Sequence, residues 1–314
     1  MSLLALDPLT LLKAMPGNIA QGIIWGIMAI GVYMTFRLLR FSDLTVDGSF
    51  TAGGATAVVL ITSGVPAPIA MLAAFGAGIL CGLCTGVLHT LFGIPDILAG
   101  ILTQIAMYSV NLRIMGGKAN QVVSVDKYTL VVTMRKIPMT IAVAGGICVA
   151  LCLILYWFFG TELGSAIRAT GTNPSMSKAQ GINISVMKVL TLALSNGLVA
   201  LSGAMLAQYQ GFADVNMGRG AIVIGLAAVI IGEVIGEALL GKKLNFLGHL
   251  LFVAVGGILY YVVIGVVLWL KMPPNDLKLF TAAVVAVFLA VPYLRAKSRN
   301  SYKRAAKKGV QENE

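Results

Sequence analysis

TELGSAIRATGTNPSMSKAQGINISVMK, the stretch from Thr161 to Lys188, is a long hydrophilic break between two strongly apolar blocks. It carries three basic residues against one acid, Glu162, and it mixes small residues, turn formers and short amphipathic pieces. The apolar blocks on either side are long enough to cross a membrane as helices, so the break itself must lie outside the hydrocarbon. We expect a membrane protein that keeps such a segment to dock a partner there.

The composition of the whole chain is that of an integral membrane protein. Of 314 residues, 58% are hydrophobic and only 11% are charged, and the mean hydropathy is +0.90. So few polar residues cannot cover a soluble globule of this size. Apolar runs recur at about the twenty residues that a spanning helix needs, without the alternation of barrel strands. The sequence therefore predicts an all-α, polytopic membrane helix bundle.

The order of the apolar runs predicts about nine spans and a topology. The last twenty residues are strongly basic, which indicates a cytoplasmic anchor at an anionic leaflet rather than a nucleic-acid-binding tail. Counting back from that tail puts the N-terminus outside and places 161–187, 241–246 and the Arg37 to Arg40 pair inside. The predicted spans are 17–36, 45–62, 66–92, 95–115, 139–160, 188–210, 221–240, 247–270 and 277–294.

This topology divides the chain into an N-terminal amphipathic segment at 1–16, a transmembrane domain at 17–294 and a basic cytoplasmic tail at 295–314. The first fifteen residues lack the pattern of a removable signal peptide. The loop 115–138 falls outside although it carries several basic residues, against the positive-inside rule. Its alternation of apolar and polar residues predicts a short extracytoplasmic hairpin that meets a partner.

Two of the predicted spans are short, rich in glycine and polar at one end. They contain DGSFTAGGATA, which starts at Asp47, and GLAAVIIGEVIGEALLG, from Gly225 to Gly241. Discontinuous helices of this kind are tolerated in membranes only where protein or a watery cavity covers the freed backbone. We therefore expect both spans to be interrupted and to lie inside the bundle.

Several patterns suggest a nucleotide, metal or cation site, but a simpler interpretation is favoured for each. GEALLGKK, from Gly236 to Lys243, lacks the hydroxyl residue of a phosphate-binding loop and follows a membrane run instead of a strand. The four cysteines lie inside apolar runs without a second pair or nearby histidines, so we interpret them as packing residues. Glu233 and Glu237 could bind a cation or proton, but an ion-pair cluster with Lys242 and Lys243 is the simpler interpretation.

Polar side chains inside the spans are candidates for a solute pathway, because they are expensive in lipid and normally face the bundle interior. Gln104, Tyr108 and Asn111 fall on one stripe of a helix. The stripe either lines a pathway for a polar solute or forms a hydrogen-bonded helix contact, and the sequence leaves both open. Asn196 and Gln208 form a second candidate lining in the sixth span.

The hydrophilic break and the span after it, GSAIRATGTNPSMSKAQGINISVMK followed by SGAMLAQYQG, resemble the permease subunits of bacterial ABC importers of the branched-chain amino acid and monosaccharide class. In that family a glycine precedes a basic residue and a small-residue turn, and a Gly-Ile-Asn element leads into the next span. The resemblance implies that the break is a coupling helix seated in a groove of a separate ATPase subunit. The matching positions are Gly164, Arg168, Ala169, Gly171, Asn173, Ala179, Gly181, Ile182 and Asn183.

The resemblance covers nearly the whole chain. FSDLTVDGSFTAGGA, ILAGILTQIAMYSVNLRIMG and AAVIIGEVIG are together similar to the subgroup often assigned to tryptophan or tyrosine uptake. Two departures stand out: the Glu-Ala-Ala signature of the other importer permease class is absent, and Glu233 and Glu237 stand where the sugar branch tends to have glycines. Coupling details of the other class therefore do not transfer, and the role of that turn stays open.

The favoured hypothesis is a permease subunit that moves a small polar solute inward through the bacterial inner membrane by alternating access. The solute is an amino acid, with aromatic ones implied by the resemblance alone. The expected partners are a cytoplasmic ABC ATPase, an extracytoplasmic solute-binding protein, a second copy of the chain and membrane lipid, but no nucleic acid. The chain would be no enzyme and hold no cofactor or metal, with ATP and Mg on the ATPase.

Two alternatives remain from the residues. The first is an ion-driven secondary transporter that uses Glu233, Glu237 or Asp47 as a proton or sodium site. The second is a membrane enzyme or receptor, for which the sequence supplies no nucleophile, metal set or acid–base pair.

Overall fold

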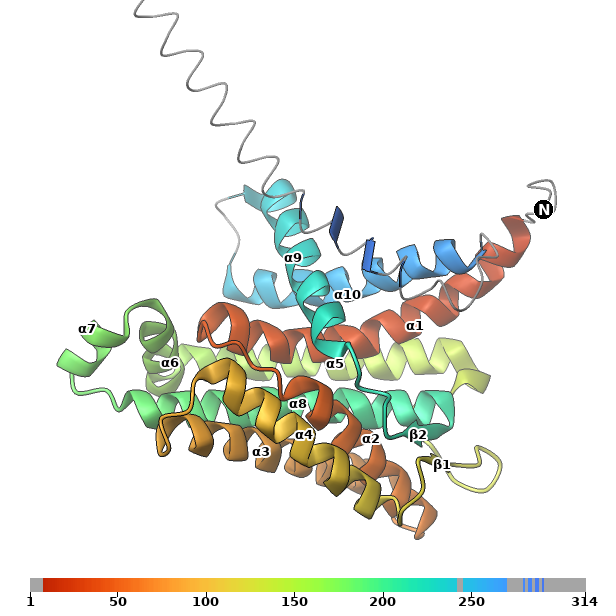
Figure 1. Cartoon of the computed structure of the whole chain (residues 1–314). Helices are drawn as coiled ribbons and strands as arrows, with labels where there is room; N and C mark the ends of the chain where they lie inside the picture. The colour runs from red at the N-terminus through yellow and green to blue at the C-terminus, as the bar shows by residue number, and fades with distance from the viewer. Residues whose placement is uncertain are drawn as a thin grey trace, which may run out of the picture.

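The computed structural model describes residues 8–241 and 245–269, together with positions 279, 282, 283, 286, 287 and 290. Within this part the chain is a bundle of helices with one small β-ribbon (Figure 1). The membrane-length elements are α1 (Pro8–Tyr33), α2 (Val46–Thr62), α3 (Ala67–Thr90), α4 (Asp96–Ile114), α5 (Ile137–Gly160), α8 (Ile184–Gln210), α9 (Ala221–Leu240) and α10 (Phe246–Trp269). The shorter ones are the π-helix η2 (Met34–Leu38), β1 (Asn120–Val122), the 3-10 helix η3 (Met134–Lys136), α6 (Glu162–Thr172), α7 (Pro174–Ala179) and β2 (Phe212–Asp214).

The predicted helical membrane bundle is confirmed. Seven helices of the described part are long and apolar enough to cross a membrane, and α2 is a shorter apolar helix. These eight helices match eight of the predicted spans. The ninth, 277–294, falls almost wholly outside the described residues, as do the basic tail and residues 1–7, so the count of nine stays a prediction. The boundary at residue 16 also stays a prediction, since α1 runs through it without a break.

The β-ribbon joins two loops that are far apart in sequence. β1 follows α4 and pairs antiparallel with β2, which follows α8, with Gln121 opposite Ala213. The loops after α4 and α8 therefore lie on one side of the bundle, in agreement with the predicted topology. The hairpin predicted within 115–138 is wrong, because β1 pairs with β2 of the loop after α8 and not with a second strand of its own loop.

Small residues bring α8 into close contact with α2 and α3 at the centre of the bundle. A side chain at Gly53 would overlap the backbone of Ala200, and one at Gly82 would overlap the backbone of Leu192. α1 and α8 are mostly buried, whereas α4 and α5 are mostly exposed. The glycine-rich sequence thus yields the tight bundle that small residues permit in membranes.

Two segments without regular helical structure turn back into this bundle (Figure 1). After the π-helix at the end of α1, residues 39–45 return to the middle of the bundle before α2 begins. Asp43 is fully buried there and accepts a hydrogen bond from Asn196 Nδ2 at 2.7 Å. Asn196 lies about 18 Å along α8 from Ile184, at the 1.5 Å rise per residue of an α-helix. Residues 215–220 likewise lead back from β2 to the start of α9.

These two segments correct the expectation of glycine-broken spans. α2 and α9 are each continuous, so their glycines do not interrupt the helices. The discontinuity lies before each helix, where the chain turns back and the two N-termini meet inside the bundle. The glycines pack instead: a side chain at Gly232 of α9 would overlap the backbone of Phe252 in α10.

Candidate solute cavity and coupling segment

A cavity of about 490 Å³ lies where α2, α4 and the start of α9 meet. Three of the five predicted pathway residues, Gln104, Tyr108 and Asn111, line this one cavity. The helical stripe predicted for them is therefore present as a polar wall. The other lining residues are Asp47, Gly48, Thr51, Ile101, Ile105, Ser109, Val215 and Arg219.

Asp47 fastens the start of α9 to α2. Its Oδ2 accepts the backbone N–H of Gly220 at 2.9 Å and its Oδ1 accepts that of Ile222 at 3.0 Å. The first N–H groups of a helix have no partner within the helix, and they carry its positive dipole end. Gly220 adopts a left-handed conformation and supplies no cap from its own side chain. A carboxylate from another helix therefore does what a local cap usually does.

A second bond strengthens the same junction. The backbone N–H of Gly218 donates to Thr51 Oγ1 at 3.1 Å, one turn along α2 from Asp47. The return segment 215–220 is thus held by two side chains of α2. Any shift of α2 relative to α9 must break these contacts at the cavity wall.

The polar stripe of α4 also touches α2. Asn111 donates from Nδ2 to the carbonyl oxygen of Gly48 at 3.2 Å, and Gln104 Nε2 lies 3.5 Å from Asp47 Oδ2. Tyr108, between them on the stripe, is 45% exposed. The stripe therefore makes the predicted helix contact and also lines the cavity, and its role in a solute pathway stays a prediction.

The second predicted lining lies elsewhere. Asn196 is fully buried, accepting from Ser49 Oγ at 2.6 Å and donating to Asp43. Gln208 is also fully buried, and its Oε1 accepts the backbone N–H of Val131 at 3.1 Å. Neither residue lines the cavity. In this structure both join helices or loops inside the chain, so a pathway role for them stays a prediction.

The sequence interpretation missed Arg219 and Thr51 at the cavity. Arg219 is the one charged residue of the short segment that follows β2, NMGRG, between two apolar spans. A lone basic residue in such a segment was the sequence feature that could have identified Arg219 as a candidate. Thr51 carried no such signal, because threonine is common in membrane helices and its partner at Gly218 is far away in sequence.

The predicted coupling segment consists of two short helices, α6 and α7, and leads into α8. Local side chains cap α7 and α8. Asn173 Oδ1 accepts the backbone N–H of Met176 at 3.1 Å and starts α7. Asn183 Oδ1 accepts that of Val186 at 3.2 Å and starts α8. Gly181, with φ of 82°, makes the left-handed turn between them that favours glycine. These residues give the segment its shape.

Three other predicted positions anchor the segment to the bundle. A side chain at Gly164 would overlap the backbone of Phe159, and one at Gly171 would overlap the carbonyl oxygen of Leu38. Arg168 donates from Nη2 to the carbonyl oxygen of Phe159 at 2.9 Å and stacks over the ring of Phe246 at 5.8 Å. The segment is therefore attached to the ends of α1, α5 and α10.

The remaining predicted positions differ in exposure. Ala169 and Ala179 are exposed, whereas Ile182 is half-buried against the core. Met176 on α7, which the resemblance did not single out, is 60% exposed. The free surface of the segment thus lies on α6 and α7, away from the bundle.

Glu233 of α9 pairs with an arginine of η2. Its Oε1 lies 2.7 Å from Arg37 Nε. The predicted partners Lys242 and Lys243 fall outside the described residues, and Glu237 is exposed. Arg37 directly precedes Leu38, whose carbonyl oxygen packs against Gly171, so this ion pair lies beside the coupling segment.

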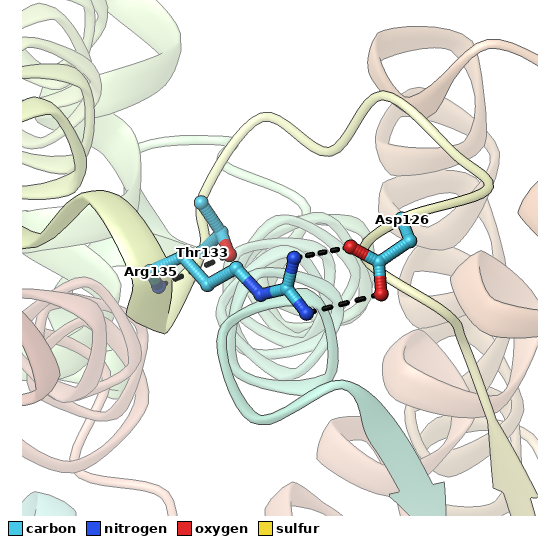
Figure 2. A network of polar contacts seen from close by, with 3 residues as sticks. All are labelled: Asp126, Thr133 and Arg135. Carbon is cyan, nitrogen blue, oxygen red and sulfur yellow. Dashed lines mark hydrogen bonds and ion pairs between the residues drawn. The ribbon is translucent and has the colours of Figure 1, made fainter.

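On the opposite side of the bundle, an ion pair braces the loop 115–138. Figure 2 shows the Arg135 guanidinium bonded to both carboxylate oxygens of Asp126, with Nη2 at 3.0 Å from Oδ2. Thr133 Oγ1 accepts the backbone N–H of Arg135 at 3.4 Å. The hydrogen bonds and charge of Arg135 lower the pKa of Asp126 below its usual value.

Comparison with known proteins identifies relatives over most of the chain. Residues 16–292 match the family described as branched-chain amino acid transport system, permease component. The tyrosine transport system permease protein of Clostridioides difficile (strain R20291) is 41% identical over 86% of this chain and 88% of that protein. An uncharacterized protein of Rickettsia prowazekii (strain Madrid E) is 30% identical over 86% of this chain and 94% of that protein. The galactofuranose transporter permease protein of Escherichia coli (strain K12) is 30% identical over 84% of this chain and 75% of that protein.

Proposed function

Because this chain belongs to the branched-chain amino acid permease family, as a multi-pass ABC transporter permease of the bacterial inner membrane, we propose that it imports an amino acid, and specifically an aromatic one. Uptake proceeds by alternating access, with the solute passing along the α4 side of the cavity. The tyrosine permease of Clostridioides difficile, at 41% identity, supports the aromatic class.

The observation that carries this proposal is the polar cavity inside an otherwise apolar chain. Polar groups at membrane depth are costly unless they bind one another or face water and solute. Here Gln104, Tyr108, Asn111 and Arg219 converge on one space of about 490 Å³. A space of that size lies within the range of small-molecule sites, roughly 300 to 1,000 Å³.

The coupling segment supports a motor outside the chain. Its two helices are fixed to the bundle by Gly164, Arg168 and Gly171, and they present exposed residues outward. We propose that an ABC ATPase docks on this surface, and that ATP and Mg are bound by that subunit. In this account the permease performs no bond chemistry and holds no cofactor.

The other partners follow from the same proposal. A second copy of the chain completes the passage, a solute-binding protein delivers the amino acid from outside, and membrane lipid surrounds the assembly. The largely exposed α4 supports the second copy, because Tyr108 of its polar stripe is 45% exposed on a helix that this chain leaves mostly uncovered.

Uptake by proteoliposomes tests the driving force. The permease is reconstituted with its ATPase and binding protein, and labelled L-tyrosine is supplied outside. We expect accumulation that stops when ATP is withheld and persists with a protonophore. Accumulation that persists without ATP and collapses with the protonophore would contradict the proposal and revive the ion-driven alternative.

The acids considered for that alternative are already engaged or exposed. Glu233 pairs with Arg37, and the Asp47 carboxylate holds the start of α9. Glu237 is exposed near the end of α9. No observation in the described part of the chain favours an ion site at any of the three.

A further inference from the structure

Arg219 lines the cavity, and no carboxylate of the described residues forms an ion pair with it. Its backbone N–H donates to the carbonyl oxygen of Asn216 at 3.0 Å, but its guanidinium has no hydrogen-bond acceptor or carboxylate there. A guanidinium presents a planar fork of donors that matches a carboxylate. The cavity therefore holds a ready donor group for an anionic part of a solute.

Asn111 contributes the opposite kind of group. The residue is 1% exposed, and its Nδ2 is used by the carbonyl oxygen of Gly48. Its Oδ1 is buried and has no hydrogen-bond partner. A buried acceptor left without a donor costs roughly 1 to 3 kcal/mol. A donor that reached this atom would recover that cost.

Asp47 adds an acceptor with a negative charge. Each of its oxygens takes one short hydrogen bond from the start of α9, and Gln104 lies at the limit of a third. A carboxylate offers about four lone-pair sites, so it can take a further donor. No lysine or arginine of the described part forms an ion pair with Asp47.

The cavity thus combines one cation, one anion and one orphan acceptor. The charges of Asp47 and Arg219 sum to zero, and the two side chains make no ion pair with each other. A zwitterion satisfies both charges, whereas an uncharged sugar leaves both without a counter-charge. Part of the remaining wall is apolar, with Ile101, Ile105 and Val215 available to a side chain.

We propose that the cavity recognises both charged ends of a free amino acid. Asp47 and Asn111 accept hydrogen bonds from its ammonium group, and Arg219 donates to its carboxylate. This inference rests on the proposed function, since it assigns the solute's groups to atoms of the proposed passage. It also separates this chain from a sugar permease on grounds of charge.

Three probes with one ring test the assignment on the assembled permease and ATPase in nanodiscs. L-tyrosine carries both groups, tyramine lacks the carboxylate, and 3-(4-hydroxyphenyl)propionate lacks the ammonium. Equilibrium binding is measured without the binding protein, so that only the passage selects. We expect each truncated probe to bind at least about tenfold more weakly, which is the effect of losing one charged hydrogen bond.

The variants assign each group to its residue. Arg219→Gln should weaken tyrosine about tenfold and leave tyramine unchanged. Asn111→Leu should weaken tyrosine and tyramine and leave the propionate unchanged. Arg113→Gln removes the same charge from a residue outside the cavity lining and should change none of the three.

Asp47→Asn should follow the pattern of Asn111→Leu, and thermal unfolding of each variant shows whether the fold is kept. Equal weakening of all three probes would mean a structural role and overturn the assignment, as would tyrosine that binds no better than the truncated probes or not at all. ATP-dependent uptake by the same preparation separates this result from the proposed function, because uptake of tyrosine can persist when the assignment fails.

Discussion

The starts of α7 and α8 and the start of α9 differ in how their first backbone N–H groups are capped. α7 and α8 are each capped by the asparagine directly before them, Asn173 and Asn183. α9 follows a glycine without a side chain, and Asp47 of α2 supplies the cap from far away in sequence. The coupling segment therefore holds its own shape, whereas α9 depends on α2 for the order of its first turn.

This difference suggests how the two regions work. A segment that docks a motor must keep its shape while the bundle moves, and local caps allow that. A helix that borders the passage must respond to what happens in the passage. Because the cap of α9 is also a wall of the cavity, a change at Asp47 reaches α9 directly.

The largest expected effect comes from Asp47→Ala. The change leaves the N–H groups of Gly220 and Ile222 without partners inside the bundle, at a cost of about 3 kcal/mol in the free energy of unfolding. Thermal unfolding and hydrogen exchange at the first turn of α9 measure it. Asp126→Ala makes the same substitution at an exposed site and should have little effect. Unchanged protection at the start of α9 would contradict the capping role of Asp47.

Gly171→Ala tests the attachment of the coupling segment. A methyl group there overlaps the carbonyl oxygen of Leu38, so α6 must shift from the end of α1 at about 2 kcal/mol. We expect ATP hydrolysis to continue while tyrosine uptake per ATP falls. Gly145→Ala, where a methyl group meets open space on α5, is the matched control. Equal uptake per ATP in both variants would refute the attachment.

Asn183→Ala should have a smaller and local effect of about 1 kcal/mol, typical of a lost N-cap. The expected result is faster hydrogen exchange of the Val186 amide, with α9 unchanged. Asn216→Ala, whose side chain makes no hydrogen bond within the described residues, serves as control. Faster exchange at the start of α9 as well would show that the two regions are less separate than proposed.

The smallest effect concerns the loop 115–138 and pH. The folded pKa of Asp126 lies below its unfolded value, so its contribution to stability is present above the unfolded pKa and lost as pH falls through the folded one. Proteolysis of this loop should therefore accelerate only in acid. Asp126→Asn should show the faster rate already at neutral pH, and a loop insensitive to both changes would contradict the bracing role.

The same contrast explains what the sequence could predict. Hydrophobic runs set the spans, and the turn formers of 161–188 set the two short helices, since both signals are local. Gln104, Tyr108 and Asn111 were found because helical spacing puts them on one face. Only α4's position in the bundle decided that this face borders a cavity.

The features that escaped prediction all depend on contacts across the bundle. Asp47 was singled out as a charge, but its bonds to Gly220 and Ile222 follow from two return segments that hydropathy does not reveal. Asn196 and Gln208 were singled out for their polarity, but their buried contacts with Asp43, Ser49 and Val131 could not be predicted from it. The partner of β1 could not be read from its own loop for the same reason.

The central claim is that the coupling segment docks the ATPase on the side opposite the β-ribbon. Photo-crosslinking of the assembled transporter tests it directly, with the reactive side chain placed at Met176 on α7 or at Val122 on β1, which are 60% and 68% exposed. We expect an adduct with the ATPase from Met176 and none from Val122. An ATPase adduct from Val122, with none from Met176, would contradict it.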